Sequence, residues 1–421
     1  MSSRPASQPS PRWSDTQMKK RVARRYSAER RFKFFGFAAV ALSVAFLAFL
    51  LITMASRGLS GFTRTEARLM IDLPRSDVVL DPAALEGADG RQVAAGAGLG
   101  RVIETAAVSS FGPMATEMFG SAASASLGQQ LVADPTLLQR RAEVWLPVAS
   151  SVDVAVKRDG STKAEQLAAG LEAKDVLRRS WNGDFLGLSD ATDPGSVGVW
   201  GALKGSFLTI VVTMLLAFPI GVLTAVYLEE FARRNRWNDL VEVSINNLAA
   251  VPSIIFGLLG LAVFLNLMNL PRSAPLVGGL TLALMTMPVI VIAGRNAIKS
   301  VPPSIRDAAL GVGASKMQVV FHHVLPLALP GILTGTIIGM ARALGETAPL
   351  LMIGMRAFIA TPPSGFADPA TVLPVQIFLW SDEVDRAFIE KTSAAIIVLL
   401  LFMLLMNGLA IYLRNRFERR W

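Results

Sequence analysis

Six long apolar runs, separated by polar segments, dominate the pattern of this 421-residue chain. A helix of about 20 apolar residues is long enough to cross the hydrocarbon core of a bilayer. The runs therefore predict six transmembrane helices, at about 33–56, 203–228, 243–268, 275–294, 329–354 and 392–413. The first run is longer than the roughly 7–15 apolar residues of a signal peptide, so we expect it to be an uncleaved membrane anchor.

The long polar interval between the first two runs predicts a separate domain. Its alternating patches at 69–73, 76–81 and 144–156 predict strands, and the pattern over 163–181 predicts a helix. The expected fold class is an all-α polytopic membrane protein of six transmembrane helices, with an α+β extracytoplasmic insert between the first two spans. The expected segments are a disordered basic cytoplasmic N-terminus (1–32), a first transmembrane helix (33–56), the insert (57–199), a five-helix membrane domain (200–414) and a basic cytoplasmic tail (415–421).

The distribution of charge sets the expected topology. Residues 1–36 contain ten Lys or Arg against two acidic residues, whereas 57–200 contain fourteen against eighteen. Cytoplasmic segments beside membrane spans are enriched in Lys and Arg. We therefore expect both termini in the cytoplasm and the insert outside it. The net charge of +9 then reflects membrane topology, and we expect no nucleic-acid partner.

Several kinds of chemistry are missing from the sequence. The chain has no cysteine and two adjacent histidines, His322 and His323, which argues against thiolate chemistry and a metal site. It has no phosphate-binding loop of the form G-x-x-x-x-G-K-[ST], so we expect it not to hydrolyse ATP itself. We expect no catalytic residues, no metal and no cofactor in this chain, which makes a transport subunit a better hypothesis than an enzyme.

Two charged residues lie within the fifth apolar run. Arg342 and Glu346 are four residues apart, so on a helix they share one face. Gly345 and Pro349 flank the glutamate and predict a bend. Two interpretations stay open from the residues alone. Either the pair locks neighbouring helices together, or Arg342 offers its planar donors to an oxyanion that crosses the membrane while Glu346 holds the arginine.

The polar loop 299–328 joins the fourth and fifth runs and predicts a helix–turn–helix outside the bilayer. Its small residues Ala308, Ala309 and Gly313 would let another backbone approach closely. Such a loop is suited to being held by a soluble partner.

This segment, RDAALGVGASKMQVVFHHVLP at 306–326, resembles the EAA loop of binding-protein-dependent ABC importers. The family pattern is E-A-A, three residues, G, nine residues, I, one residue and L-P. Asp307 occupies the Glu position, His323 the Ile position, and Leu325 and Pro326 close the motif. The resemblance implies that the loop couples this chain to a cytoplasmic ATPase.

A second motif narrows the resemblance. ARALGETAPL at 341–350 resembles the AR-x-x-GETAPL signature of phosphate-specific permeases of the PstA type, and NNLAAVPSIIFGLLG at 246–260 extends the likeness. The resemblance implies a substrate pathway through Arg342, Glu346 and Thr347. The family also has an arginine near the end of the preceding span, for which Arg295 is the candidate, about one helical turn later than the pattern.

The resemblance also implies the partners and the location. These are a second homologous permease subunit, two cytoplasmic ATPase subunits that use ATP and Mg²⁺, a periplasmic phosphate-binding protein, inorganic phosphate and the lipid of a bacterial plasma membrane. Alternating access would carry the phosphate. A permease for another oxyanion or small solute remains an alternative, and so does a membrane-anchored sensor that uses the insert as its ligand domain. A sensor would need only one or two spans, and a membrane enzyme would need clustered acid, base or metal residues.

Overall fold

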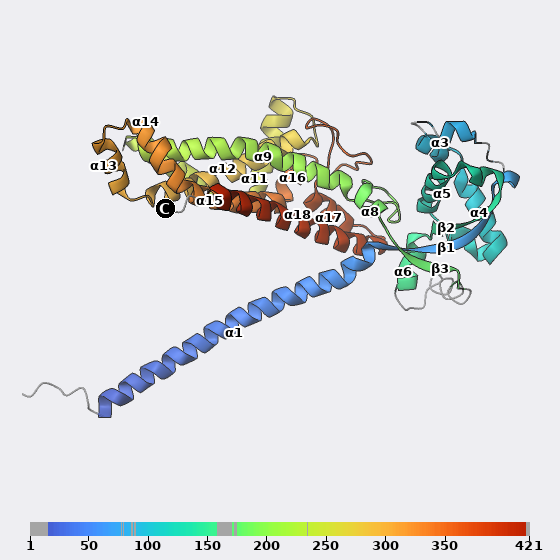
Figure 1. Ribbon diagram of the computed structural model, residues 1–421, viewed down its shortest axis with the longest axis horizontal. Helices are drawn as coiled ribbons and strands as arrows, with labels where there is room; N and C mark the ends of the chain where they lie inside the picture. Colours follow the sequence, from blue (N-terminus) through green and yellow to red (C-terminus); the bar gives the residue numbers. More distant parts are fainter. Residues whose placement is uncertain are drawn as a thin grey trace, which may run out of the picture. The chain divides into compact units, whose positions relative to one another are not determined.

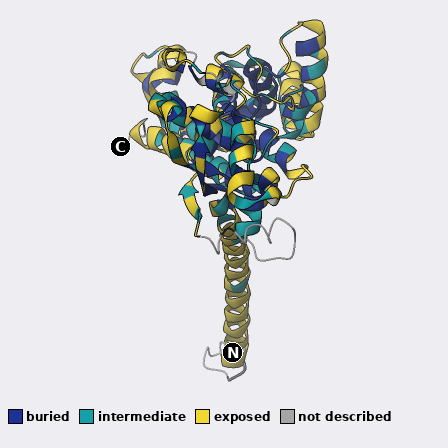
Figure 2. Cartoon of the chain, turned by 90° about the vertical axis from the view of Figure 1, so that its right-hand side faces the viewer, coloured by how far each residue is buried: buried dark blue, intermediate teal, exposed yellow. Residues whose placement is uncertain are grey.

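The computed structural model describes residues 16–417 except 77, 79, 86, 88, 89, 158–170, 172–174 and 234. The chain forms two units, residues 1–56 and 57–421. Most of the first unit is helix α1 (Thr16–Gly61), whose apolar section is exposed (Figure 2). We predicted disorder over 1–32, but residues 16–32 are helical. They contain neither Gly nor Pro and many good helix formers, so the helix of the apolar run continues into them.

The second unit begins with the predicted α+β insert. Its three strands form an antiparallel sheet of order β2-β1-β3 (Figure 1): β1 (Thr63–Asp72), β2 (Arg141–Pro147) and β3 (Leu177–Trp181). The helical elements of the insert are η1 (Leu73–Arg75), α2 (Pro82–Leu85), α3 (Gly90–Gly96), α4 (Leu99–Phe111), η2 (Pro113–Glu117), α5 (Ser121–Ala133), η3 (Pro135–Gln139), α6 (Ser150–Lys157) and α8 (Asp184–Gly187).

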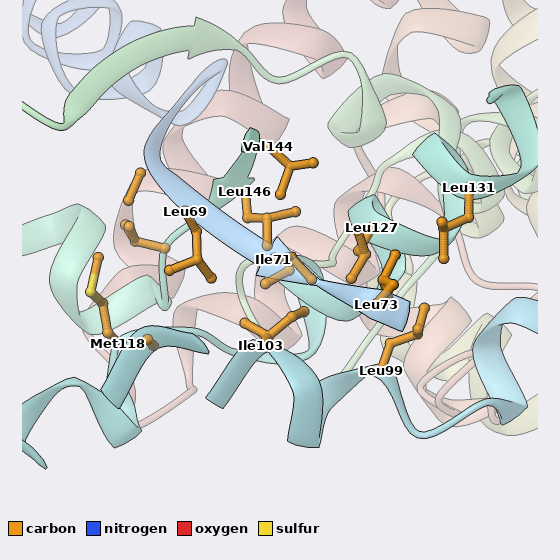
Figure 3. Close-up of a cluster of buried hydrophobic side chains, with 14 of the residues drawn as sticks. Leu69, Ile71, Leu73, Leu99, Ile103, Met118, Leu127, Leu131, Val144 and Leu146 are labelled. Atoms are coloured by element: carbon orange, nitrogen blue, oxygen red, sulfur yellow. The ribbon is translucent and has the colours of Figure 1, made fainter. Parts of the chain in front are cut away.

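The core of the insert lies between the sheet and helices α4 and α5. Leu69 and Ile71 alternate with more exposed residues along β1, so they point to one face of the sheet. Figure 3 shows these two side chains and Leu146 of β2 beside Ile103 of α4. This apolar face gives the insert its own hydrophobic core.

Three predictions for the insert were wrong in part. The segment 76–81 contains no strand among its described residues. The patch 144–156 is a strand only to Pro147, because Ser150–Lys157 forms α6. The helix predicted over 163–181 lies largely outside the described residues, and its last five residues form strand β3. β3 is a strand because it pairs with β1, in register Thr63 with Trp181, a contact that local sequence does not encode.

The rest of the second unit is a helical bundle. Its elements are α9 (Trp200–Val226), the π-helical η4 (Tyr227–Phe231), α10 (Arg236–Ala249), α11 (Ser253–Gly260), η5 (Leu261–Leu267), α12 (Pro275–Lys299), α13 (Pro303–Gly311), α14 (Lys316–Gln318), η6 (Val319–Val324), α15 (Leu325–Gly345), α16 (Ala348–Met352), α17 (Leu373–Ser381) and α18 (Ala387–Phe417). Helix α12 packs against both α9 and α15, and α15 packs against α18 (Figure 1).

The described residues contain five helices long and apolar enough to cross a membrane, or six if a bent pair counts as one span. The bent pair replaces the single helix expected at 243–268. Helix α10 and the segment from Ser253 to Leu267 meet at 102°. Pro252 lies in the break with an extended backbone (ψ 135°) and lacks the N–H that a continuous helix would use, which explains why the prediction of one helix was wrong.

Buried charges join the insert to the first turn of α18. The Nζ atom of Lys157 lies 2.7 Å from a carboxylate oxygen of Asp153 and 3.3 Å from one of Glu390, and it donates to the carbonyl oxygens of Ser60 and Thr63. These contacts compensate for the burial of an ammonium group that is only 4% exposed. The insert is therefore attached to the bundle by paired charges as well as by the chain itself.

Candidate functional site: the charged break after α15 and the α13–α14 connection

The depth of Arg342 follows from the packing of α15 on α12. The two helices run antiparallel, because Gly335 of α15 lies against Ala293 and Gly339 lies against Thr286. A Cβ atom on Gly339 would be 2.9 Å from Thr286 Cγ2, so the helices approach closely there. Thr286 is near the middle of α12, and Arg342 follows Gly339 by less than one turn. The arginine is therefore carried to about the middle of the apolar bundle.

The side chain of Arg342 does not face the core of this chain. Its neighbours Met340, Ala343 and Leu344 are buried, whereas Arg342 itself is 46% exposed. It continues an exposed face of α15 through Ile338, one turn earlier, which is 61% exposed. A guanidinium group thus lies on an open face of an otherwise apolar helix.

Arg342 and Glu346 come together as the sequence predicted, although not on one continuous helix. Helix α15 ends at Gly345, and Glu346 is extended (ψ 126°) before α16 begins at Ala348. The Nε atom of Arg342 is 3.5 Å from Glu346 Oε1, the limit of a hydrogen bond. Thr347 lies in the same break, and its carbonyl oxygen accepts from the N–H groups of Leu350 and Leu351. The predicted bend is a complete interruption.

Arg295 lies elsewhere. It is separated along α12 by about 14 Å from Thr286, the residue that faces Gly339. Its guanidinium group is buried and bonds to two carboxylates, 2.5 Å to Glu229 Oε1 and 2.7 Å to Glu242 Oε2. The structure therefore does not bring Arg295 to Arg342. Arg295 ties the end of α12 to η4 and α10.

A second arginine holds the loop after α12. Arg306 of α13 lies 2.7 Å from Glu230 Oε1 and donates to the carbonyl oxygens of Ile298 and Val301. These carbonyls belong to the last turn of α12 and to the residue that follows its C-cap, so Arg306 adds hydrogen bonds at the end of the helix. The position of α13 is thus fixed relative to both α12 and η4.

The predicted helix–turn–helix is present as α13, a turn, and α14 continuing into η6. Gly313 forms the turn with φ 87°, a conformation that favours glycine. Ser315 then caps α14 in a reciprocal pair with Gln318, the capping-box arrangement. In α13, Asp307 and Ala308 are exposed and Ala309 is buried.

The last two residues of the motif, Leu325 and Pro326, are half-buried in the first turn of α15. A proline is well placed there because the first turn of a helix leaves its N–H groups unpaired. The motif therefore ends where the next membrane helix begins.

The α13–α14 connection presents apolar side chains to the outside. Leu310 is 52% exposed, Val312 is 86% exposed and Met317 is 56% exposed. Exposed apolar side chains gathered on a polar connection are typical of a protein contact surface. We call Leu310, Val312 and Met317 the loop apolar surface.

Sequence reasoning missed the acidic partners of the two arginines. Glu229 and Glu230 directly follow an apolar run, and Glu242 lies in the next helix. Adjacent acids at the end of a membrane helix are costly unless basic side chains meet them. These adjacent acidic residues could therefore have indicated an ion-pair cluster. The basic residues to pair with them were Arg295 and, four residues later, Lys299.

Two protein families match different parts of the chain. A domain of unknown function, DUF3333, matches residues 19–166, and the binding-protein-dependent transport system inner membrane component matches residues 217–421. The first match covers most of α1 and much of the insert, and the second covers most of the helical bundle.

Individual relatives match the bundle. The phosphate transport system permease protein PstA of Haemophilus influenzae is 31% identical over 211 residues, which cover 50% of this chain and 73% of that protein. PstA 1 of Mycobacterium tuberculosis is 36% identical over 156 residues, 37% of this chain and 51% of that protein. The probable ABC transporter permease protein YqgI of Bacillus subtilis is 33% identical over 193 residues, 43% of this chain and 65% of that protein.

The match to the Mycobacterium relative spans about half the length of that protein, and the match to the Bacillus relative somewhat more. A bundle of membrane helices with a helix–turn–helix connection between α12 and α15 defines the class, an inner-membrane component of a binding-protein-dependent transport system. Within that class, this chain belongs to the family of PstA-type phosphate transport permeases.

Proposed function

We propose that this chain is the transmembrane permease subunit of an ATP-driven importer of inorganic phosphate. In this proposal Arg342 contacts the anion in transit, and Glu346 and Thr347 form the break in the helix around the arginine. The α13–α14 connection contacts the ATPase and moves when ATP is hydrolysed. The chain itself performs no chemistry on the substrate.

The observation that carries the proposal is the half-exposed Arg342 at the middle of an apolar bundle. A charge at this depth is costly when it faces lipid. The exposed face of α15 therefore needs either another protein chain or a water-filled passage against it. A guanidinium group offers paired donors that match the oxygens of phosphate, so a passage for that anion gives the exposed charge a binding function.

The source of energy follows from the loop. The chain has no phosphate-binding loop for a nucleotide, so we assign ATP and Mg²⁺ to two cytoplasmic ATPase subunits. The loop apolar surface would dock on one of them. A second homologous permease subunit would cover the exposed face of α15, and a periplasmic phosphate-binding protein would deliver the substrate.

This arrangement requires an orientation in a bacterial plasma membrane. We place both termini and the α13–α14 connection in the cytoplasm and the insert outside it, because basic residues cluster before the first span, beside α13 and after the last span. The insert would then lie on the side from which substrate arrives.

A permease for another oxyanion is the alternative in the same class, because sulfate would also accept donors from Arg342. The ARALGETAPL motif and the relatives named for phosphate transport favour phosphate. A membrane-anchored sensor has less support, since α9, α12, α15 and α18 exceed the one or two spans that it needs.

Reconstitution tests the proposal. The chain is first purified with its endogenous partners, and the complex is placed in liposomes with a phosphate-binding protein. We expect an ATPase and a second permease to copurify, and ATP hydrolysis to rise with phosphate and not with sulfate. Copurification without stimulation by any oxyanion would remove the substrate assignment, and purification of the chain without an ATPase would remove the transport assignment.

A further inference from the structure

A cavity of about 570 Å³ opens in the insert, far from Arg342 along the chain. Its walls come from the end of β1, from η1 and the loop after it, from one face of α4 and the residues just before it, and from the start of β2. This volume falls in the range of about 300–1,000 Å³ that is usual for sites of small organic ligands.

The cavity wall is strongly basic. Arg75, Arg101 and Arg141 line it, and Asp72 is the carboxylate among the described lining residues. Asp72 forms a long ion pair, in which Arg75 Nε lies 3.8 Å from Asp72 Oδ2. Arg101 and Arg141 form no ion pair within the part of the chain that the structure describes. Two guanidinium groups at the cavity are thus free to bind an anion.

Local structure explains how these groups are held. Arg141 begins β2 and faces Asp72 in the register of the sheet. Arg101 is in the first turn of α4, and one of its terminal nitrogens comes within 3.8 Å of where a Cβ atom on Gly98 would lie. The guanidinium group therefore folds back over the start of α4, where helix N–H groups also favour negative charge.

The remaining wall is not uniformly polar. Met70 of β1, Val78 of the following loop, and Val102 and Ala106 of α4 add apolar surface. A single inorganic phosphate would leave most of the cavity to water, since each water occupies about 30 Å³. The combination suits a ligand with an anionic head and an apolar body.

We propose that this cavity is a binding site for a small organic anion, with a phosphate or carboxylate head held by Arg101 and Arg141 and an apolar body against Met70, Val102 and Ala106. Both head groups share the oxyanion geometry that a guanidinium group recognises. The site is separate from the proposed transport pathway and stands or falls independently of it.

The test measures binding to the full chain in lipid nanodiscs by isothermal titration calorimetry. Phenyl phosphate and benzoate are the two anionic probes. Benzyl alcohol controls for partitioning of an aromatic ring into lipid, and inorganic phosphate controls for binding of an anion without an apolar body. The variants are Arg101→Gln and Arg141→Gln. Arg140→Gln is the matched control, because Arg140 adjoins Arg141, pairs with Asp134 and does not line the cavity.

We expect an aromatic anion to bind at least about tenfold more tightly than benzyl alcohol, because a hydrogen bond to a charged group contributes that much or more. It should also bind more tightly than inorganic phosphate, because the aromatic ring buries apolar surface in the cavity. Arg101→Gln and Arg141→Gln should each weaken binding by about tenfold or more, and Arg140→Gln should not. A preference for phenyl phosphate or for benzoate identifies the head group.

Equal binding in all three variants, or tighter binding of inorganic phosphate than of phenyl phosphate, would overturn the proposal. So would the absence of heat from both anionic probes at millimolar concentration. Thermal unfolding of each variant, compared with the parent chain, separates a lost site from a lost fold. Phosphate uptake of the complex is expected to be unchanged in the cavity variants, which keeps this result distinct from any failure of the transport proposal.

Discussion

Replacement of Arg342 should impair phosphate transport and leave the fold intact. Arg342→Lys keeps the charge but removes the two parallel donors of the guanidinium group, and Arg342→Gln removes the charge as well as these donors. The contrast variant is Arg295→Gln, which alters an arginine of the same bundle in a different setting. The structure predicts opposite outcomes for the two positions.

The magnitudes follow from the contacts of each arginine. Arg342 meets Glu346 only at 3.5 Å, and water in the passage that we propose would screen the pair, so it should contribute less than about 1 kcal/mol to stability. The side chains of Arg295 and Glu229 are both largely buried, and removal of Arg295 leaves Glu229 with only its longer contact to Lys299, at a cost of up to about 3–5 kcal/mol. Arg295→Gln should therefore lower the unfolding temperature or the yield of complex, and Arg342→Gln should not.

Phosphate uptake should depend directly on Arg342, in contrast to stability, which should depend more on Arg295. One hydrogen bond between charged groups contributes about 1.5–3 kcal/mol, so Arg342→Lys should slow phosphate uptake roughly tenfold or more, and Arg342→Gln should slow it further. Uptake into proteoliposomes measures the rate, and gel filtration of the same samples measures assembly. The double variant Arg342→Gln with Glu346→Gln leaves no unpaired charge, and it should assemble normally without recovering uptake. Near-normal phosphate flux in that double variant would refute the role of Arg342.

Three further predictions concern other parts of the chain. Gly313→Ala should weaken assembly with the ATPase, because φ 87° strains a residue with a Cβ atom by about 1 kcal/mol, and Gly313→Asn should weaken it less. Gly311→Ala is the control and should be neutral, because Gly311 has no positive φ and no atom near its Cβ position; pull-down of the ATPase compares all three variants. Single cysteines can be placed without background in this cysteine-free chain, and Glu104→Cys should label with an impermeant reagent in spheroplasts while Arg416→Cys should label only after permeabilisation; the reverse pattern would invert the topology. Burial alone would raise the pKa of Glu66, but hydrogen bonds and ion pairs from Arg178 and Arg64 outweigh it and hold the pKa below its usual range. The stabilising contribution of Glu66 is therefore present above the unfolded pKa of about 4.3 and is lost as pH falls through the lower folded value. The unfolding temperature should fall with acid more steeply in the parent chain than in Glu66→Gln, and equal acid sensitivity would contradict the assignment.

The membrane helices were predictable because their signal is local. An apolar run of sufficient length specifies a span regardless of what packs against it, and α9, α12 and α18 lie where such runs occur. The same signal cannot show where a span is interrupted. Pro252 and Pro349 marked the two breaks, but a proline can also kink a helix without ending it. The presence of Pro252 alone therefore did not predict the 102° bend before α11.

Within the insert, prediction was weaker for a physical reason. Alternation identified β1, whose Leu69 and Ile71 point into the core. Strand β3 has the sequence LRRSW, with little alternation, and it becomes a strand by pairing with β1 across more than a hundred residues. Such non-local pairing is absent from a local pattern. The cavity arginines were invisible for the same reason, since Arg75, Arg101 and Arg141 come from three elements.

The candidate site was also predictable only in part. The motifs identified Arg342, Glu346 and the α13–α14 connection, but they could not show how the connection is joined to the bundle. Arg306 makes that join, since it holds Glu230 of η4 and two carbonyl oxygens at and just beyond the end of α12. A displacement of α13 must therefore move the end of α12 and the end of α9 together.

In the function that we propose, helix α12 would transmit that displacement along its length. Gly335 and Gly339 bring α15 into close contact with α12, so we expect the two helices to move together. The movement then reaches Gly345, where α15 ends and its backbone hydrogen bonding is interrupted at Glu346. A rigid pair of helices that ends in a break can move the Arg342 side chain relative to α16 without breaking the packing of either helix. In the function that we propose, helix packing and the ion pairs of Arg295 with Glu229 and of Arg306 with Glu230 would couple events at the α13–α14 connection to the accessibility of the guanidinium group.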